Sequence, residues 1–162
     1  MSTNDATTYG QQGAWTDRRS RAFLILGIVA VVGGGLLSAI IAPTPSYVGS
    51  WAVAYIVLVG GAAQVALGVA QASVARRPLT RGILLTQVLL LNLGVAGTVV
   101  ATVANIPVLL YLSAAAQVAA VIFLLAATRK GRPGAALITL RVVAIVLLIG
   151  SPTGVILQAV AS

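Results

Sequence analysis

Cysteine and histidine are both absent from this chain of 162 residues, and only two of its side chains are acidic. Without cysteine there is no disulfide, thiol nucleophile or cysteine-bound cluster, and without histidine the usual zinc and haem ligands are missing. The two acids, Asp5 and Asp17, lie in the polar N-terminal segment, so no apolar segment holds paired carboxylates or a carboxylate relay. We therefore expect no enzyme activity, no cofactor and no metal.

Charge of either sign is scarce, and this scarcity sets the class of protein. Charged residues make up 7% of the chain and hydrophobic residues 59%, with a mean hydropathy of +1.06. So few polar side chains cannot cover the surface of a soluble domain. The composition predicts an integral membrane protein, with the lipid bilayer as its first partner.

Long apolar segments follow one another along the chain, and each has about the 20 residues that a helix needs to cross a bilayer. They cover residues 22–41, 51–71, 82–103, 107–127 and 135–161. We expect an all-α, polytopic transmembrane helix bundle over residues 21–162, with five spans. Residues 1–20 are polar and poor in aliphatic side chains, which predicts a disordered cytoplasmic tail.

The last apolar segment has two interpretations. Residues 135–161 form either a fifth span that is kinked at Pro152, or a span that ends near Gly150 and is followed by a short interfacial tail, so that four full spans are the alternative. Arg141 lies inside this segment, some two turns from Arg132. The side chain of Arg141 is expected to snorkel back to the basic side of the membrane.

Basic residues predict the orientation of the bundle. All ten fall before the first span, between the second and third, or between the fourth span and the start of the fifth. By the positive-inside rule, the N-terminus is cytoplasmic. The net charge of +8 is then a topology signal, and because it is scattered over short loops beside a membrane we expect no nucleic-acid partner.

One face of the second span is lined by small and amide side chains. Gly60, Gln64, Gly68 and Gln71 recur at helical spacing, so this face should meet protein and the span should lie at the centre of the bundle. Amides in later spans and one internal arginine complete the candidates for helix packing or for lining a pore: Gln87, Asn92, Gln117 and Arg141. Gln87 and Asn92 are about 140° apart on a helix, so they cannot both face one pore.

The segment GGAAQVALGV (60–69), with Thr80-Arg81-Gly82 after a basic loop, resembles the GG-x-AQ-x-x-x-G segment of the acetate uptake transporter family. Residues 121–150 are similar to the later helix, basic turn and helix of that family. The first span here lacks the family's Asn-Pro-Ala-Pro-Leu-Gly-Leu signature, and the chain has five predicted spans where the family has six. The resemblance implies a helical membrane fold and an acetate-like anion as a candidate solute.

Two functions from different classes fit these observations. The first is a non-catalytic accessory or structural subunit of a bacterial membrane complex, with other membrane-protein subunits as partners. The alternative is a small-solute channel or facilitator that acts as a homo-oligomer, because five short helices enclose little pore. The abundance of Ala, Val, Leu and Gly with few Lys indicates a GC-rich bacterium, and hence a location in the plasma (inner) membrane.

Overall fold

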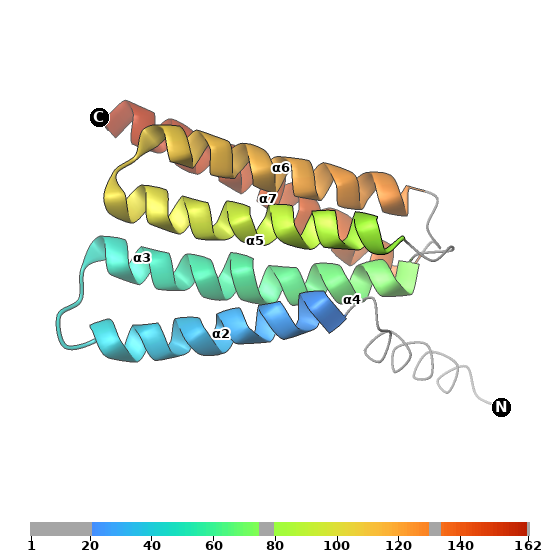
Figure 1. Ribbon diagram of the computed structural model, residues 1–162, viewed down its shortest axis with the longest axis horizontal. Helices are drawn as coiled ribbons and strands as arrows, with labels where there is room; N and C mark the ends of the chain where they lie inside the picture. The colour runs from blue at the N-terminus through green and yellow to red at the C-terminus, as the bar shows by residue number, and fades with distance from the viewer. Residues whose placement is uncertain (1–20, 75–79, 130–133, 162) are drawn as a thin grey trace.

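The computed structural model describes residues 21–74, 80–129 and 134–161, and the side chains among them up to residue 149; the predicted N-terminal tail lies outside these residues. Within them the chain is a bundle of helices without strands (Figure 1). The elements are α2 (Arg21–Ile41), α3 (Tyr47–Tyr55), η1 (Ile56–Ala63), α4 (Gln64–Val74), α5 (Arg81–Ala104), α6 (Pro107–Thr128) and α7 (Ala135–Ala161). The structure confirms the predicted all-α bundle.

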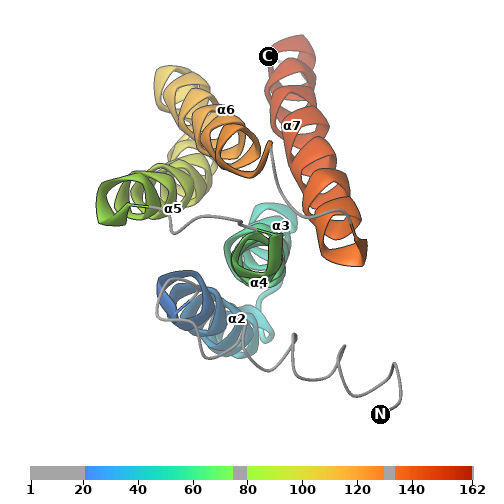
Figure 2. The same ribbon diagram turned by 90° about the vertical axis from the view of Figure 1, so that its right-hand side faces the viewer.

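Elements α3, η1 and α4 form one continuous helix, Tyr47–Val74, which we call the central helix. Seen along the bundle, α2, α5, α6 and α7 are arranged around it (Figure 2). Among the described residues, four helices are long and apolar enough to cross a membrane: α2, the central helix, α5 and α6. Together with the order of the helices, this defines a polytopic membrane bundle.

The central helix starts earlier than the sequence predicts and changes its winding midway. Ser46 caps it by accepting a hydrogen bond from the backbone N–H of Gly49 (3.0 Å), so the helix begins at Tyr47 and not at the predicted Trp51. Residues Ile56–Ala63 are wound as a π-helix, which is rare and uncommonly long here. The helix returns to α winding at Gln64.

Helix α2 packs chiefly on the central helix, and glycines bring the two backbones together. A Cβ atom added to Gly27 would lie 2.6 Å from Cγ2 of Val65 and 3.0 Å from the carbonyl oxygen of Gly61. A Cβ atom added to Gly61 would lie 2.5 Å from Cγ2 of Val31. Such close approach is how helices gain packing energy where no water is expelled.

Helices α5 and α6 form the tight antiparallel hairpin that the short turn Ala104–Pro107 predicts. Thr80 caps the start of α5, and Asn105 ends it in the left-handed conformation with a φ of 53°. Pro107 occupies the first turn of α6, where its missing N–H costs no hydrogen bond. Gly94 lies where the two helices pack closely: an added Cβ would be 2.5 Å from Cγ of Gln117.

Helix α7 closes the bundle against α4 and α6. Leu140, Ala144 and Leu147 lie on its inward face and join a core to which all five helices contribute. Its backbone continues as helix through Pro152 to Ala161, so the helix does not stop near Gly150. Side chains beyond residue 149 lie outside the described part.

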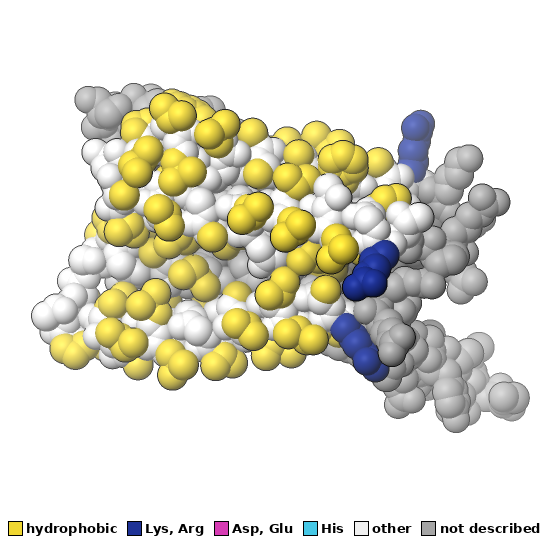
Figure 3. All heavy atoms as spheres, in the orientation of Figure 1, with side chains coloured by type: hydrophobic (Ala, Val, Ile, Leu, Met, Phe, Trp, Pro, Cys, Tyr) yellow, Lys and Arg dark blue, Asp and Glu magenta, His cyan; other side chains and the backbone are white. Residues whose placement is uncertain are grey.

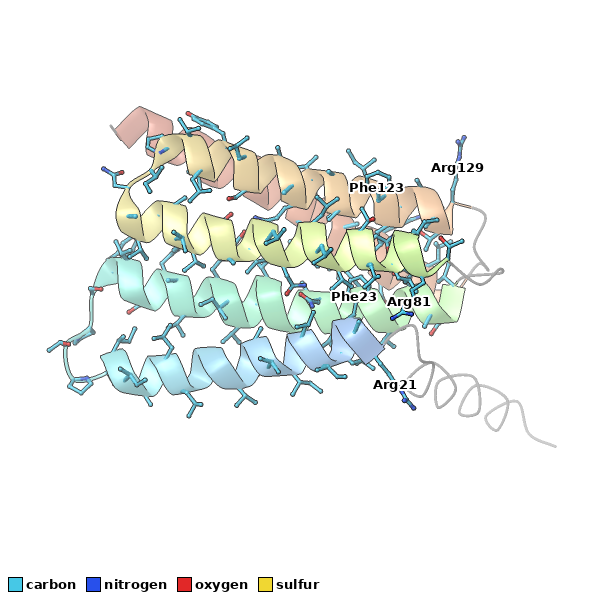
Figure 4. All side chains as sticks on the ribbon, viewed as in Figure 1. Arg21, Phe23, Arg81, Phe123 and Arg129 are labelled. Atoms are coloured by element: carbon cyan, nitrogen blue, oxygen red, sulfur yellow. The ribbon has the colours of Figure 1, made fainter. Side chains whose placement is uncertain are left out.

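The outer surface of the bundle is apolar along most of its length, and positive charge gathers at one end (Figure 3). Arg21, Arg81 and Arg129 come from the starts of α2 and α5 and from the end of α6, and all three lie at that end (Figure 4). An apolar band beside a basic end is the surface that a bilayer with anionic headgroups accommodates.

Candidate functional site: polar side chains in the bundle core

A row of polar side chains runs along the inward side of the central helix. Gln64 and Gln71 are buried, and Tyr55 lies higher on the same helix, half-buried. Sixteen residues of α-helix, at about 100° each, would place Tyr55 and Gln71 about 160° apart, on nearly opposite faces. A π-helix turns less per residue than an α-helix, so the segment Ile56–Ala63 changes this angle and alters which side chains share a face. In the structure Tyr55 and Gln71 both reach neighbouring helices.

Gln117 of α6 is the centre of a hydrogen-bonded group near the N-terminal part of the central helix, which we call the upper group. The hydroxyl of Tyr55 donates to its Oε1 (2.7 Å), and its Nε2 donates to Oγ1 of Thr98 (2.8 Å) and to the carbonyl oxygen of Gly94 (3.1 Å). Three elements, α3, α5 and α6, are joined at this one amide. Polar groups in a bilayer have no water to bond, so each of these bonds also removes an unsatisfied group.

A second hydrogen bond, near the C-terminal end of the central helix, joins that helix to α5. Nε2 of Gln71 donates to Oε1 of Gln87 over 2.9 Å, and both side chains are buried. The two bonds, at Tyr55 and at Gln71, hold the central helix near each end of the row. Along the helix axis they are roughly 20–24 Å apart, most of the thickness of a hydrocarbon core.

Gln64 lies between these two groups and has no partner. It is 0% exposed, and both its Nε2 and its Oε1 lack a hydrogen bond. Nε2 of Gln87 is also unbonded and buried. An amide buried without a partner costs free energy, and the cost is greatest where the surroundings are apolar. These unbonded atoms are therefore expected to lower the stability of the core.

The two glycines of the predicted seam pack on the chain's own helices. Gly68 lies against Phe23 of α2, with 2.5 Å from an added Cβ to Cβ of Phe23, and Gly60 lies against Val95 of α5 and Ala30 of α2. The seam that the sequence singles out is thus buried inside a single chain. Within the described part of the chain, α2 and α5 cover this face, so its glycines and glutamines are not available to a second protein.

Asn92 and Arg141, the remaining candidates, do not join the row. Nδ2 of Asn92 donates to the carbonyl oxygen of Val88 in its own helix (2.8 Å), and the side chain is half-buried. Gln87 faces the core while Asn92 turns elsewhere, as their spacing predicts. Arg141 is exposed on the outside of α7, so it does not line an interior path.

Sequence reasoning missed two residues of the upper group. Tyr55 lies near the start of the predicted second span, a position typical of an aromatic anchor in the headgroup region. Sequence reasoning passes over Thr98, because a hydroxyl in an apolar segment bonds its own helix as readily as a neighbour. One signal could have identified Thr98. It lies near Gly94 and Gly97, and these small residues pack against α6 in the α5–α6 hairpin.

Chemically, this site bonds helices to one another. Among the described residues, no three His, Cys, Asp or Glu side chains gather as metal ligands would. Fold and site together define a polytopic helical membrane protein whose interior polar groups are amides and hydroxyls. Comparison with protein-family models, with curated proteins and with solved structures gives no significant match.

Replacing Gln64 by leucine is expected to stabilise the bundle by about 1–3 kcal/mol, because the change removes two unbonded polar atoms and keeps nearly the same volume. The measurement is the free energy of unfolding in lipid bicelles. Asn92→Leu is the control, since it removes an amide that already has a partner. A loss of stability in Gln64→Leu would mean that this amide is bonded.

Proposed function

We propose that this protein is a non-catalytic accessory or structural subunit of a membrane complex. The observation that supports the proposal is the use of its interior polar groups: the amides of Gln117, Gln71 and Gln87 bond one helix of the chain to another. Polar groups used in this way stabilise the packing of the helices. The surface that remains for contact with other molecules is the apolar outside of the bundle.

The homo-oligomeric channel is the weaker candidate. A pore between copies of the chain needs polar side chains on the outside, whereas the amides of this row face the inside of one chain. The exposed large side chains of α2, α5, α6 and α7 are aliphatic and aromatic, apart from Arg21 and Arg81 at the basic end and Arg141 on α7. These surfaces suit lipid or another apolar helix.

The orientation belongs to the same proposal. Arg21, Arg81 and Arg129 share one end of the bundle, and the positive-inside rule assigns that end to the cytoplasm. The N-terminus is then cytoplasmic, and the membrane is a bacterial plasma membrane. Cysteine scanning is a clean test because the chain has no cysteine of its own. A cysteine at Gly82 should react only with a reagent that has entered the cell, and one at Asn105 with an impermeant reagent outside.

Native mass spectrometry after gentle extraction from the original host, at natural expression level, tests the function. We expect a different membrane protein to copurify at fixed stoichiometry. Liposomes that contain the purified chain should show no flux of acetate or other small anions above that of empty liposomes. A closed homo-oligomer that conducts, with flux reduced by Gln117→Leu but not by Asn92→Leu, would replace this proposal with the channel.

A further inference from the structure

We propose that Arg141, on the outer face of α7, binds a carboxylate side chain that lies within a membrane helix of a second protein. This inference rests on the proposed function and adds the chemistry of the partner, which is an apolar helix that carries an Asp or a Glu. The feature that supports it is one charged side chain on a surface that is otherwise suited to lipid.

Arg141 differs from the other described arginines in its place along its helix. Arg21, Arg81 and Arg129 lie at or next to helix ends, at the basic end of the bundle (Figure 4). Arg141 lies inside α7, six residues after its first residue, Ala135, which is about 9 Å along the helix axis. The side chains next to it on the outer surface of α7 are apolar and 52–65% exposed: Ile138, Val142 and Ile145.

The side of α7 on which Arg141 lies indicates that its partner is outside this chain. Ionisable side chains within membrane helices almost always face protein or a water-filled cavity, because an unpaired charge in lipid is costly. The core of this chain lies on the other side of α7, at Leu140, Ala144 and Leu147. The protein that Arg141 faces therefore belongs to another chain.

The guanidinium group determines what that protein must carry. It stays charged, and it can donate two parallel hydrogen bonds to one carboxylate. The chain's own acids, Asp5 and Asp17, both precede the first apolar segment, so an apolar segment of a second copy does not supply the carboxylate. The partner is therefore a different protein, with its acid at the depth of Arg141. A side chain that extends to the headgroups would bind a lipid phosphate instead, and the experiment separates the two.

Photo-cross-linking identifies what covers the outer face of α7. The full-length chain is produced in the original host at natural level, with p-benzoylphenylalanine incorporated at Ile145, which lies one turn from Arg141. We expect cross-links to a membrane helix, and mass spectrometry of the cross-linked peptide should find Asp or Glu within its apolar segment. The control position is Leu93 of α5, which is 65% exposed on the other side of the bundle (Figure 2). It should not capture this helix.

Substitutions at Arg141 then test the pairing itself. Arg141→Leu should reduce the cross-linked fraction at least about tenfold, because the carboxylate of the partner is left in the membrane without its counter-charge. Arg129→Leu, which removes an exposed arginine beside the end of α6, is the matched control and should leave the yield unchanged. Arg141→Asp, combined with a change of the partner's acid to arginine, should restore the yield. This rescue separates the pairing from any effect on folding.

Three results would overturn the inference: a captured helix without an acid in its apolar segment, a yield that Arg141→Leu leaves unchanged, or cross-links to lipid alone. The last would assign Arg141 to a lipid phosphate. The proposed function has its own test. A protein that copurifies with the chain but cross-links only at other faces removes this inference and leaves the proposed function, whereas the absence of any copurifying protein removes both.

Discussion

Replacing Gln117 by leucine is expected to destabilise the bundle by about 2–4 kcal/mol, because Tyr55, Thr98 and Gly94 each lose a hydrogen bond that joins their helix to α6. Tyr55, Thr98 and Gly94 come from two different helices, and Gln117 on a third joins them. The measurement is the free energy of unfolding, in bicelles, of the wild type and the variant. The same substitution at Gln64 is expected to act in the opposite direction.

That difference in sign is the sharpest check on the hydrogen bonds assigned here. Both glutamines are buried, and both are replaced by the same residue, so volume and hydrophobicity change alike. Only the number of bonded partners differs. Equal losses in both variants would show that Gln64 has a partner, and equal gains would show that Gln117 is not the centre of the upper group. A double-mutant cycle with Tyr55→Phe then measures the coupling between Tyr55 and Gln117 directly.

Replacing Gly94 by leucine is expected to separate α5 from α6 and to cost about 3 kcal/mol or more, because the neighbouring atoms include backbone that cannot move aside. The Cβ atom alone would meet Cγ of Gln117 at 2.5 Å, the carbonyl oxygen of Ser113 at 3.0 Å and the amide nitrogen of Gln117 at 3.1 Å. The fraction of folded protein recovered in detergent and the midpoint of thermal unfolding both report the effect.

Gly35→Leu is the matched control for the change at Gly94. Gly35 also lies within a membrane helix, but nothing stands within 4 Å of a Cβ atom added there. Leucine at this position should leave stability unchanged or raise it slightly, since leucine is the better helix former. If both variants lost stability to the same extent, helix propensity rather than packing would explain the result at Gly94.

Much of the fold can be predicted from the sequence because α2, the central helix, α5 and α6 are long apolar segments separated by turns or basic residues, whereas the end of α7 is ambiguous. The turn at Asn105 and Pro107 pairs α5 with α6, and the basic clusters mark one end of the bundle. The central place of the second span also follows from its residues, since Gly60, Gln64, Gly68 and Gln71 repeat at helical spacing and only a surrounded helix can bury them.

The partners of these side chains could not be predicted in the same way. Helical spacing assumes a constant rotation per residue, and the π segment Ile56–Ala63 breaks that assumption between Tyr55 and Gln71. No residue type in this segment predicts the change from α to π winding, because its aliphatic and small side chains are equally compatible with an α-helix. The hydrogen-bond partner of each glutamine depends on the angle at which the helices cross. The same angle determines that Gln64 has no partner.

The glycine contacts between α2 and the central helix also bear on the order in which the bundle is made. Tyr55, Gln64 and Gln71 lie on the central helix, yet the hydrogen-bonding partners of Tyr55 and Gln71 belong to α6 and α5, which are synthesised later. Until then, the partners that these two side chains have in the folded bundle are missing. Helix α2 precedes the central helix in the chain, and the close contacts at Gly27 and Gly61 let the two pack together without polar groups. Among the described helices, α2 and the central helix are thus the pair that can pack before α5, α6 and α7 are made.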